Sequence, residues 1–255
     1  MKHRVPILTF LLVIALLFGV NVASQTPSQT SDKPLYQPNG TEASLVGTIG
    51  VQGVIPKPRR IDMTADPVCI ELNAEAQTED FIANENRLVN AFVYVKSDSL
   101  AAYKFSQPDS GVTLERKKCG YSPRVLGLRV GQSLVVVNSD PTTHNTHPTP
   151  KLNPEWNYSQ SPQGEPIIKT FSRAEVLIPF KCNQHPWEKA YVAVLDHPFF
   201  AVTDASGNFE IRGLPAGNYT LVVWHERLGE QQLQISLSPN ENRRADFTFD
   251  SDKKP

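Results

Sequence analysis

Short runs of β-branched and aromatic residues, separated by turn-forming residues, are the feature that most constrains the fold. The 255-residue chain contains 21 prolines, which argues for strands and turns rather than helices. Many short strands separated by Gly, Pro or Asn turns are typical of β-sandwiches. We therefore predict an all-β fold, with strand-like runs at 44–55, 88–96, 125–130, 133–138, twice within 167–182, and at 189–197, 200–203, 208–212, 218–225, 232–237 and 245–249.

Three stretches between these runs lack the strand pattern. Residues 56–87 are polar and irregular, and the part from 73 to 87 is compatible with one short helix. "SDPTTHNTH" (139–147) follows a strand-like run and is interpreted as a loop, and 151–167 is polar and Pro-rich without periodicity. We expect these segments to connect strands.

The first 24 residues have the composition of a secretory signal peptide. Lys2 and Arg4 form a basic start, an apolar run covers 7–20, and the small-residue sequence "VAS" precedes Gln25. The alternative is an uncleaved N-terminal anchor, because the run is long for a signal peptide and short for a full membrane span. We expect an exported protein, located in the periplasm or at the cell surface or outside the cell, with membrane contact only if the segment stays attached.

The rest of the composition narrows the class of partner. Residues 25–43 are polar and rich in Pro, Ser and Thr, and they are interpreted as a flexible linker. Residues 251–255 form a short tail. The formal net charge is −1, so there is no basic excess of the kind that favours nucleic acid as a partner.

The three cysteines give an odd count for an exported chain. Cys69 and Cys119 have no neighbours typical of a metal site, so we predict that they form a structural disulfide. Closing a loop of that length can stabilise the fold by roughly 4 kcal/mol. Cys182 is then left over, and a free thiol outside the cytosol is prone to oxidation. A bound metal ion would protect it.

His144, Cys182 and His185 together suggest copper. A soft thiolate with two imidazoles suits this metal, and a trigonal set of two His and one Cys with a weak axial ligand is the blue-copper arrangement. The first histidine follows a strand-like run, the cysteine ends a later one, and the second histidine lies three residues further on. Two neighbouring strands of a sandwich can bring these positions together, and a rigid sheet would hold them with little reorganisation.

The segment containing these residues resembles the cupredoxins, the plastocyanin-like blue-copper proteins. The resemblance rests on "SPRVLGLRVGQSLVVVNSDPTTHN", "KTFSRAEVLIPFKCNQHPW" and "AYVAVL", and it covers about 106–196. It implies a Greek-key β-sandwich that binds one copper ion through His144, Cys182 and His185. It also implies that the backbone of Asn145 steadies the cysteine sulfur.

The resemblance further implies single-electron transfer to a redox protein. His185 is then the expected exit for the electron, at the solvent edge of the site. Trp187 lies two residues later in "HPW" and would form part of an apolar rim on which a partner docks.

The axial position departs from the family pattern. Cupredoxins usually have a Met shortly after the second histidine, but this chain has Glu188, and its only methionines are Met1 and Met63. Three alternatives follow: Glu188 binds the metal, His147 binds as a third imidazole, or the site has lost its copper. The ordinary reading of Glu188 is a solvated charge beside Lys189.

A second resemblance lies in the C-terminal part of the chain. "AVTDASGNFEIRGLPAGNYTLVVWHE" resembles the carboxypeptidase regulatory-like domain, a transthyretin-like β-sandwich that is also described as carbohydrate-binding-like. Such domains begin with strands like "GTIGVQG" and "AFVYVK", which here precede the cupredoxin-like segment. We therefore predict a discontinuous sandwich from 44–105 and 197–250. The alternative is a longer domain from 44 to 196 followed by a short appended sandwich.

The hairpins of this second sandwich have a mechanical reading. Asp204 and Gly207 are predicted to form a tight turn. Phe209, Tyr219 and Leu221 are predicted to point into the core. His225 and Glu226 follow a strand-like run and are interpreted as a structural hydrogen-bonding pair rather than a second polar site.

Three functions remain open from the sequence. The favoured one is electron transfer through copper, without catalysis. The second is a non-catalytic module that binds a carbohydrate or a cell-surface protein. It predicts that Trp156, Trp187 and Trp224 lie exposed on one face and that the metal-site residues diverge. The third is a copper enzyme, which would need an open coordination position.

Overall fold

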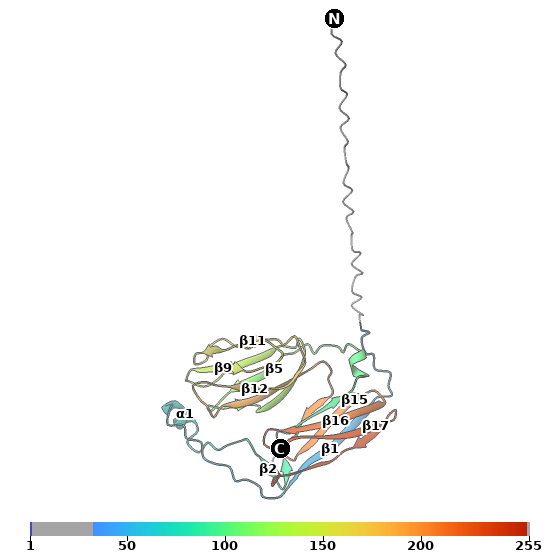
Figure 1. Ribbon diagram of the computed structural model, residues 1–255. Helices are drawn as coiled ribbons and strands as arrows, with labels where there is room; N and C mark the ends of the chain where they lie inside the picture. Colours follow the sequence, from blue (N-terminus) through green and yellow to red (C-terminus); the bar gives the residue numbers. More distant parts are fainter. Residues whose placement is uncertain (2–32, 254–255) are drawn as a thin grey trace. The chain divides into compact units, whose positions relative to one another are not determined.

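The computed structural model describes Met1 and residues 33–253. The described chain is all-β, as predicted, and its strands form four sheets (Figure 1). The strands are β1 (Ala43–Gln52), β2 (Ala83–Asn84), β3 (Arg87–Leu88), β4 (Phe92–Lys96), β5 (Val112–Arg116), β6 (Tyr121–Ser122), β7 (Val125–Arg129), β8 (Leu134–Asn138), β9 (His144–Pro148), β10 (Tyr158–Gln160), β11 (Ile167–Lys169), β12 (Glu175–Lys181), β13 (Lys189–Leu195), β14 (Phe200–Val202), β15 (Asn208–Leu214), β16 (Gly217–His225), β17 (Gly229–Leu237), β18 (Asn242–Arg244) and β19 (Phe247–Asp250). One α-helix, α1 (Pro67–Leu72), and one 3-10 helix, η1 (Leu100–Ala102), complete the elements.

Two of the sheets combine strands from the beginning and the end of the described chain. One has the order β15-β1-β3-β2, with β18 and β19 also paired to β1, and the other has the order β14-β4-β16-β17. We call these sheets the split sandwich (β1–β4 and β14–β19). Its core includes Leu45, Ile49, Phe209, Tyr219 and Leu221, so the three core residues predicted from the hairpins point inward. The predicted tight turn is also present, because Asp204 accepts hydrogen bonds from the backbone of Ser206 and Asn208 and Gly207 has a φ of 70°.

The other two sheets are built from one uninterrupted stretch of the chain. Their orders are β10-β9-β12-β13-β7 and β11-β8-β5-β6, and we call them the continuous sandwich (β5–β13). Their shared core includes Leu114, Leu128, Val136, Phe180 and Val192. Two pairs within them, β5 with β8 and β7 with β13, are parallel. The division of the chain into two domains, with boundaries at 105 and 196, stays a prediction.

A third apolar layer joins the two sandwiches. Phe92 and Val222 of the split sandwich pack with Val125 and Ala193 of the continuous sandwich. Strands at this layer are buried on both faces, which explains why "FVYV" in β4 and "VAVL" in β13 are unbroken apolar runs. The close approach requires a glycine, because a Cβ atom at Gly127 would lie 2.4 Å from the ring of Phe200.

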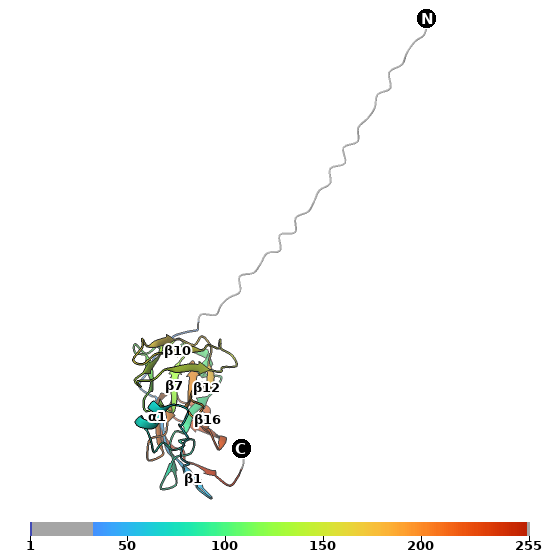
Figure 2. The same ribbon diagram turned by 90° about the vertical axis from the view of Figure 1, so that its left-hand side faces the viewer.

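The segment between β1 and β2 crosses the end of the continuous sandwich. We call residues 56–80 the cover segment; it contains α1 and Cys69, which forms the predicted disulfide with Cys119. The expectation of a helix within 73–87 is wrong. The helix starts earlier because Asp66 caps the amide of Val68 at 2.9 Å and Pro67 occupies the first turn. Figure 2 views the molecule from the side on which α1 lies.

Several other expectations need correction or lie outside the described residues. The segment interpreted as a loop after residue 138 contains β9, and the stretch 151–167 contains β10. Most of the predicted signal peptide and much of the predicted linker fall in residues 2–32, outside the described part. Within the described residues, no helix is long and apolar enough to span a bilayer.

Candidate metal centre

Four side chains meet at one end of the continuous sandwich. His144 begins β9, Cys182 directly follows β12, and His185 and Glu188 lie in the short connection to β13. One ligand atom from each of the four lies within 4.8 Å of the others. All four residues are buried, with exposed fractions of 0–3%. The structure thus brings the three predicted ligands together with Glu188, one of the two residues considered as a fourth ligand.

The donor atoms have the spacing of a coordination shell. The Nδ1 atoms of His144 and His185 are 2.9 Å apart, and they lie 2.8 and 3.1 Å from Oε1 of Glu188. The Sγ atom of Cys182 lies 3.6 Å from Nδ1 of His185. Two donors that each bind a metal at about 2.0–2.1 Å with tetrahedral angles lie roughly 3.3 Å apart. The four atoms could therefore surround one small metal ion after minor adjustment.

The carboxylate oxygen at the centre lacks a proper donor. Oε1 of Glu188 is buried, and none of the described groups donates a hydrogen bond to it with acceptable geometry, although two imidazole nitrogens lie close by. An unpaired buried carboxylate oxygen is costly. A cation bound between the four donors would compensate it, so the residues fit a metal ion.

Each imidazole turns Nδ1 toward the centre and Nε2 toward a carboxylate. Nε2 of His185 lies 3.0 Å from Oδ2 of Asp66, and Nε2 of His144 lies 3.2 Å from Oδ2 of Asp140. The contact between His144 and Asp140 does not have hydrogen-bond geometry, so Nε2 of His144 has no hydrogen-bonded partner. A carboxylate behind a metal-binding histidine fixes its ring and raises its basicity. Both histidines have this arrangement.

Glu188 is held by a fully buried arginine. Nε of Arg116 donates to Oε2 of Glu188 at 3.0 Å, and its Nη2 donates to the carbonyl of Asn145 at 2.6 Å and also contacts the hydroxyl of Tyr121. Arg116 is 0% and Glu188 1% exposed. The interpretation of Glu188 as a solvated charge is therefore wrong. Oε2 of Glu188 pairs with the guanidinium of Arg116, and Oε1 faces the two imidazoles.

The sulfur of Cys182 lies where Asn145 can steady it. The amide of Asn145 points to Sγ at 3.5 Å, and the thiol lies 3.4 Å from Oδ1 of the same residue. Oδ1 also accepts the amide of Asn183 at 2.8 Å. Asn145 thus has the position that the resemblance implied, and it ties β9 to the loop after β12.

The electrostatics of the cluster favour separated charges. Burial alone would raise the pKa of Cys182, but hydrogen bonds with the two histidines lower it to about 6. Burial would lower the pKa values of the histidines, but contacts with Asp140 in His144 and with Cys182 in His185 raise each to about 10. Burial would raise the pKa of Glu188, but the two imidazoles lower it to about 2. A metal ion would bind the two anions and displace protons from both imidazoles.

His147 does not join the cluster. Its Nε2 lies 2.5 Å from Oε1 of Glu155, and its Nδ1 lies 3.1 Å from Oδ1 of Asn183. His144 and His147 are both in β9 and lie three positions apart, so their side chains point to opposite faces of the sheet. The proposal of His147 as a third imidazole ligand is therefore wrong.

The expected solvent edge at His185 is also wrong. His185 is only 3% exposed. Asp66 of the cover segment binds its Nε2, and Sγ of Cys69 lies 3.9 Å from the same nitrogen. Trp187 packs against the ring with centroids 5.1 Å apart. The tryptophan therefore has the expected neighbour, but the edge of His185 itself is closed by the cover segment.

Sequence reasoning missed the three residues that hold the ligands. Asp140 had a signal, because it stands four residues before His144 in "SDPTTHN". Arg116 and Asp66 had none, because each is separated from its partner by more than 70 residues and their neighbours in the chain do not point to a site. Only the fold brings them to the cluster.

The other polar residues singled out in the sequence lie elsewhere. His225 is buried against Phe81, and Glu226 pairs with Arg124 at 2.5 Å. This pair differs from the expected contact between His225 and Glu226, and it joins the two sandwiches. The three tryptophans pack in three different apolar clusters. They do not form the exposed platform that a binding module would need.

Comparison with known proteins shows a similarity of the C-terminal strands to one family model. Residues 181–250 match the family model of the carboxypeptidase regulatory-like domain. The match confirms the predicted resemblance of these strands. It starts at the end of β12, although β13 pairs with β12 and β7 of the continuous sandwich. Among curated proteins, none matches the chain in sequence.

Solved structures similar to the chain include copper proteins. A methionine-to-alanine variant of amicyanin in its Cu(I) form is 18% identical, with 40% of this chain and 97% of amicyanin covered and a TM-score of 0.30. A purple cupredoxin from Nitrosopumilus maritimus is 21% identical, with 32% of this chain and 98% of the cupredoxin covered and a TM-score of 0.28. A copper-containing nitrite reductase from Thermus scotoductus SA-01 is 18% identical, with 53% of this chain and 27% of the reductase covered and a TM-score of 0.31.

Proposed function

We propose that the protein binds one mononuclear copper ion and transfers single electrons. His144, Cys182, His185 and Glu188 would hold the ion. The observation that carries the proposal is the convergence of these four buried donors around Oε1 of Glu188, a carboxylate oxygen without a hydrogen-bond donor. A cluster with this much buried charge is unfavourable without a compensating ion.

The donor set supports copper over other metals. A thiolate and two imidazoles suit copper, and nitrogen and sulfur sites generally bind Cu²⁺ more tightly than Zn²⁺. Copper, when bound, supplies a reversible one-electron couple. A carboxylate in place of the usual thioether is a harder ligand, so we expect it to favour the oxidised ion and a lower reduction potential than a Met ligand would.

The rest of the cluster supports electron transfer rather than catalysis. Arg116 holds Glu188, and carboxylates stand behind both imidazoles, so the donors can keep their positions when the charge of the ion changes. The four donors are buried and their ligand atoms lie within 4.8 Å of one another. An ion held by all four would have the closed set of four protein ligands that supports electron transfer over catalysis. A copper enzyme would need an open coordination position.

We also propose export to the periplasm or the cell surface, and a redox protein as the partner. The disulfide between Cys69 and Cys119 is typical of oxidising compartments. The basic and apolar sequence of residues 1–24 supports the same location. The binding-module alternative has no supporting observation, because the tryptophans are dispersed and the metal-site residues converge.

The decisive experiment is a Cu(II) titration of the purified protein, followed by visible and EPR spectroscopy. We expect an intense thiolate-to-copper band that saturates at one ion per chain and is absent in Cys182→Ser. His147→Gln is the matched control, because its imidazole lies on the opposite face of β9, and it should keep the band. A wild-type protein without the band, whose Cys182 thiol still reacts with a thiol reagent, would refute the proposal.

A Glu188→Met variant tests the fourth ligand. If Glu188 binds the metal, the variant should keep the thiolate band but change its energy and the copper hyperfine splitting, because an oxygen ligand is replaced by a thioether. An unchanged spectrum would show that the carboxylate does not coordinate.

A further inference from the structure

The edge of His185 that points away from the metal site is closed by the cover segment. Oδ2 of Asp66 lies 3.0 Å from Nε2, and Sγ of Cys69 lies 3.9 Å from it. The imidazole is 3% exposed. An electron acceptor in solution cannot reach this edge while the cover segment stays in place.

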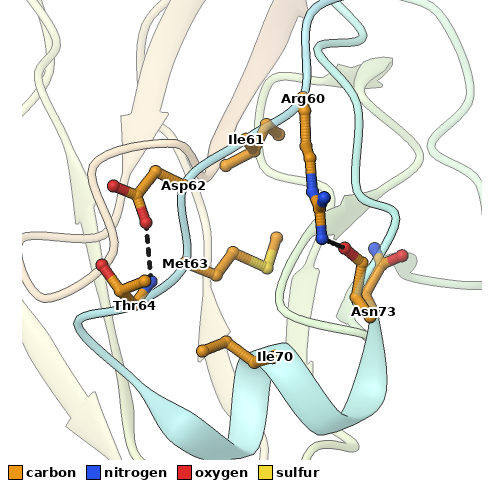
Figure 3. A pocket seen from close by; sticks show the side chains of 8 residues that line it. Arg60, Ile61, Asp62, Met63, Thr64, Ile70 and Asn73 are labelled. Atoms are coloured by element: carbon orange, nitrogen blue, oxygen red, sulfur yellow. Dashed lines mark hydrogen bonds between the residues drawn. The ribbon is translucent and has the colours of Figure 1, made fainter.

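The cover is fixed at several points. Asp66 caps α1 and accepts a hydrogen bond from the hydroxyl of Thr142 at 2.9 Å. The disulfide joins α1 to the connection between β5 and β6. Met63 is buried with both cysteines of the disulfide. Figure 3 shows its side chain pointing inward between Ile61 and Ile70. These contacts make the cover part of the folded structure.

His144 provides no alternative path for an electron from the metal site to solvent. It is 0% exposed, its Nε2 faces the buried carboxylate of Asp140, and the aromatic ring it contacts is that of His185. Cys182 is 2% exposed, and the carboxylate of Glu188 is covered by the buried Arg116. The ligands themselves are therefore all shielded from solvent.

Trp187 connects this closed cluster to the surface. Its ring packs against His185 with centroids 5.1 Å apart and an interplanar angle of 37°. Its Nε1 donates to the carbonyl of Cys119 at 3.0 Å, which fixes the orientation of the indole. Trp187 is only partly buried, and it lines an open groove of about 770 Å³. Of the described aromatic rings in contact with either histidine ligand, the indole is the one that reaches solvent.

We propose that electrons pass between the metal site and external acceptors through the ring of Trp187, and not through the edge of His185. This inference rests on the proposed function. Each transfer oxidises Cu(I) to Cu(II) and reduces the acceptor by one electron, with no bond made or broken. Trp187 is a positioning residue in this scheme: it provides the contact between a ligand ring and the groove.

The test measures electron-transfer rates with small acceptors. The Cu(I)-loaded protein is mixed with ferricyanide in a stopped-flow instrument, and the growth of the thiolate-to-Cu(II) band is followed. Tris(phenanthroline)cobalt(III) serves as a second acceptor, because its positive charge controls for Lys117, Lys118 and Lys189 in the groove. Trp187→Leu should be several-fold slower than wild type with both acceptors, and Trp187→Phe should recover most of the loss.

Trp224→Leu is the matched control. Trp224 is also partly buried, but it packs against Tyr191 away from His185, so its loss should leave the rates unchanged. An unchanged rate in Trp187→Leu would overturn the inference, as would an equal loss in Trp224→Leu. A wild-type protein without the copper band would instead refute the metal site itself, so the two failures are distinguishable.

A second measurement does not depend on electron transfer. The three indole N–H signals are assigned by NMR with single Trp→Phe variants, and the spectra of Co(II)-loaded and Zn(II)-loaded protein are compared. The signal of Trp187 should be shifted or broadened most by the paramagnetic ion, because its ring contacts a ligand. A larger effect on the signal of Trp156 or Trp224 would contradict the contact.

Discussion

Two histidine environments in this protein are equally buried but electrostatically opposite. His144 and His185 have exposed fractions of 0% and 3%, and His225 has 1%. Contacts with carboxylates and a thiol overcome burial and raise the pKa values of the first two to about 10. At His225, burial and the nearby charge of Arg124 act together and lower the pKa to about 4.

The difference shows that partners, and not burial alone, decide the charge of a buried histidine. The ring of His225 packs against Phe81, and its Nδ1 accepts the amide of Arg227, so it is suited to the neutral form. The rings of the metal centre face anions on both sides. One environment is a structural core position, and the other can hold a cation.

The largest effect should come from replacing Arg116, the positively charged side chain that pairs with Glu188. Arg116→Met leaves the carboxylate of Glu188 buried without its partner, and breaking a buried pair in this way typically costs about 3–5 kcal/mol. We expect a loss of this size in the free energy of unfolding of the metal-free protein, measured by denaturant titration. Arg212→Ala is the control, because its pair with Glu210 is exposed, and it should leave the stability unchanged. A small loss in Arg116→Met would show that the cluster does not depend on this pair.

Acid should next destabilise the protein through His225. Its folded pKa of about 4 lies below the ordinary value of 6.5, so the unfolded chain binds the proton first as the pH falls. The stability linked to this residue is complete above 6.5 and is lost between 6.5 and 4, to a total of about 3 kcal/mol.

The measurement is the free energy of unfolding from pH 7 to 4, compared with that of His225→Gln. The raised pKa values of His144 and His185 and the lowered pKa of Cys182 act equally in wild type and variant, so the difference between the two profiles isolates His225. The variant should have a flatter profile than wild type. Parallel profiles would show that His225 does not titrate abnormally.

A bound metal ion should stabilise the protein through the environment of His144 and His185, and not through that of His225. Zn(II), a redox-inert substitute, at 100 times its dissociation constant should raise the unfolding free energy by about 2.7 kcal/mol. The gain should disappear in Cys182→Ser and persist in His225→Gln, as measured by thermal or denaturant unfolding. An equal gain in Cys182→Ser would place the ion elsewhere.

The smallest effect should come from the histidine that shares β9 with a ligand. His147 pairs with Glu155, whose side chain is 58% exposed, and such pairs typically contribute about 0–1 kcal/mol. His147→Ala should therefore change the unfolding free energy by less than about 1 kcal/mol and leave metal affinity intact, as measured by competition with a chelator. A clear loss of affinity would return His147 to the ligand set.

Much of the fold could be predicted from the chain itself. The apolar runs of β1, β4, β7, β8 and β16 are visible as strands because their burial pattern is written in consecutive residues. The short strands β2, β5, β6, β9, β10 and β18 could not be predicted in this way. Their residues are mostly polar or mixed, and they are strands because of the neighbours they pair with.

The candidate site divides in the same way. The spacing from Cys182 to His185 and Glu188 is local, so these residues could be singled out together from the sequence. The role of Glu188 could not be settled, because a glutamate beside a lysine is usually solvated. Its burial depends on Arg116, which is 72 positions away in the chain.

The sequence by itself determined the all-β class, the disulfide partners and the three central donor residues, because alternation, cysteine count and local spacing are properties of short stretches. Only the tertiary structure decided that Glu188 lies buried beside the three predicted donors, that His147 faces away, and that Asp66 closes the edge of His185. These outcomes depend on contacts between segments far apart in the chain. Such contacts arise when apolar layers pack and bring the ends of particular strands together.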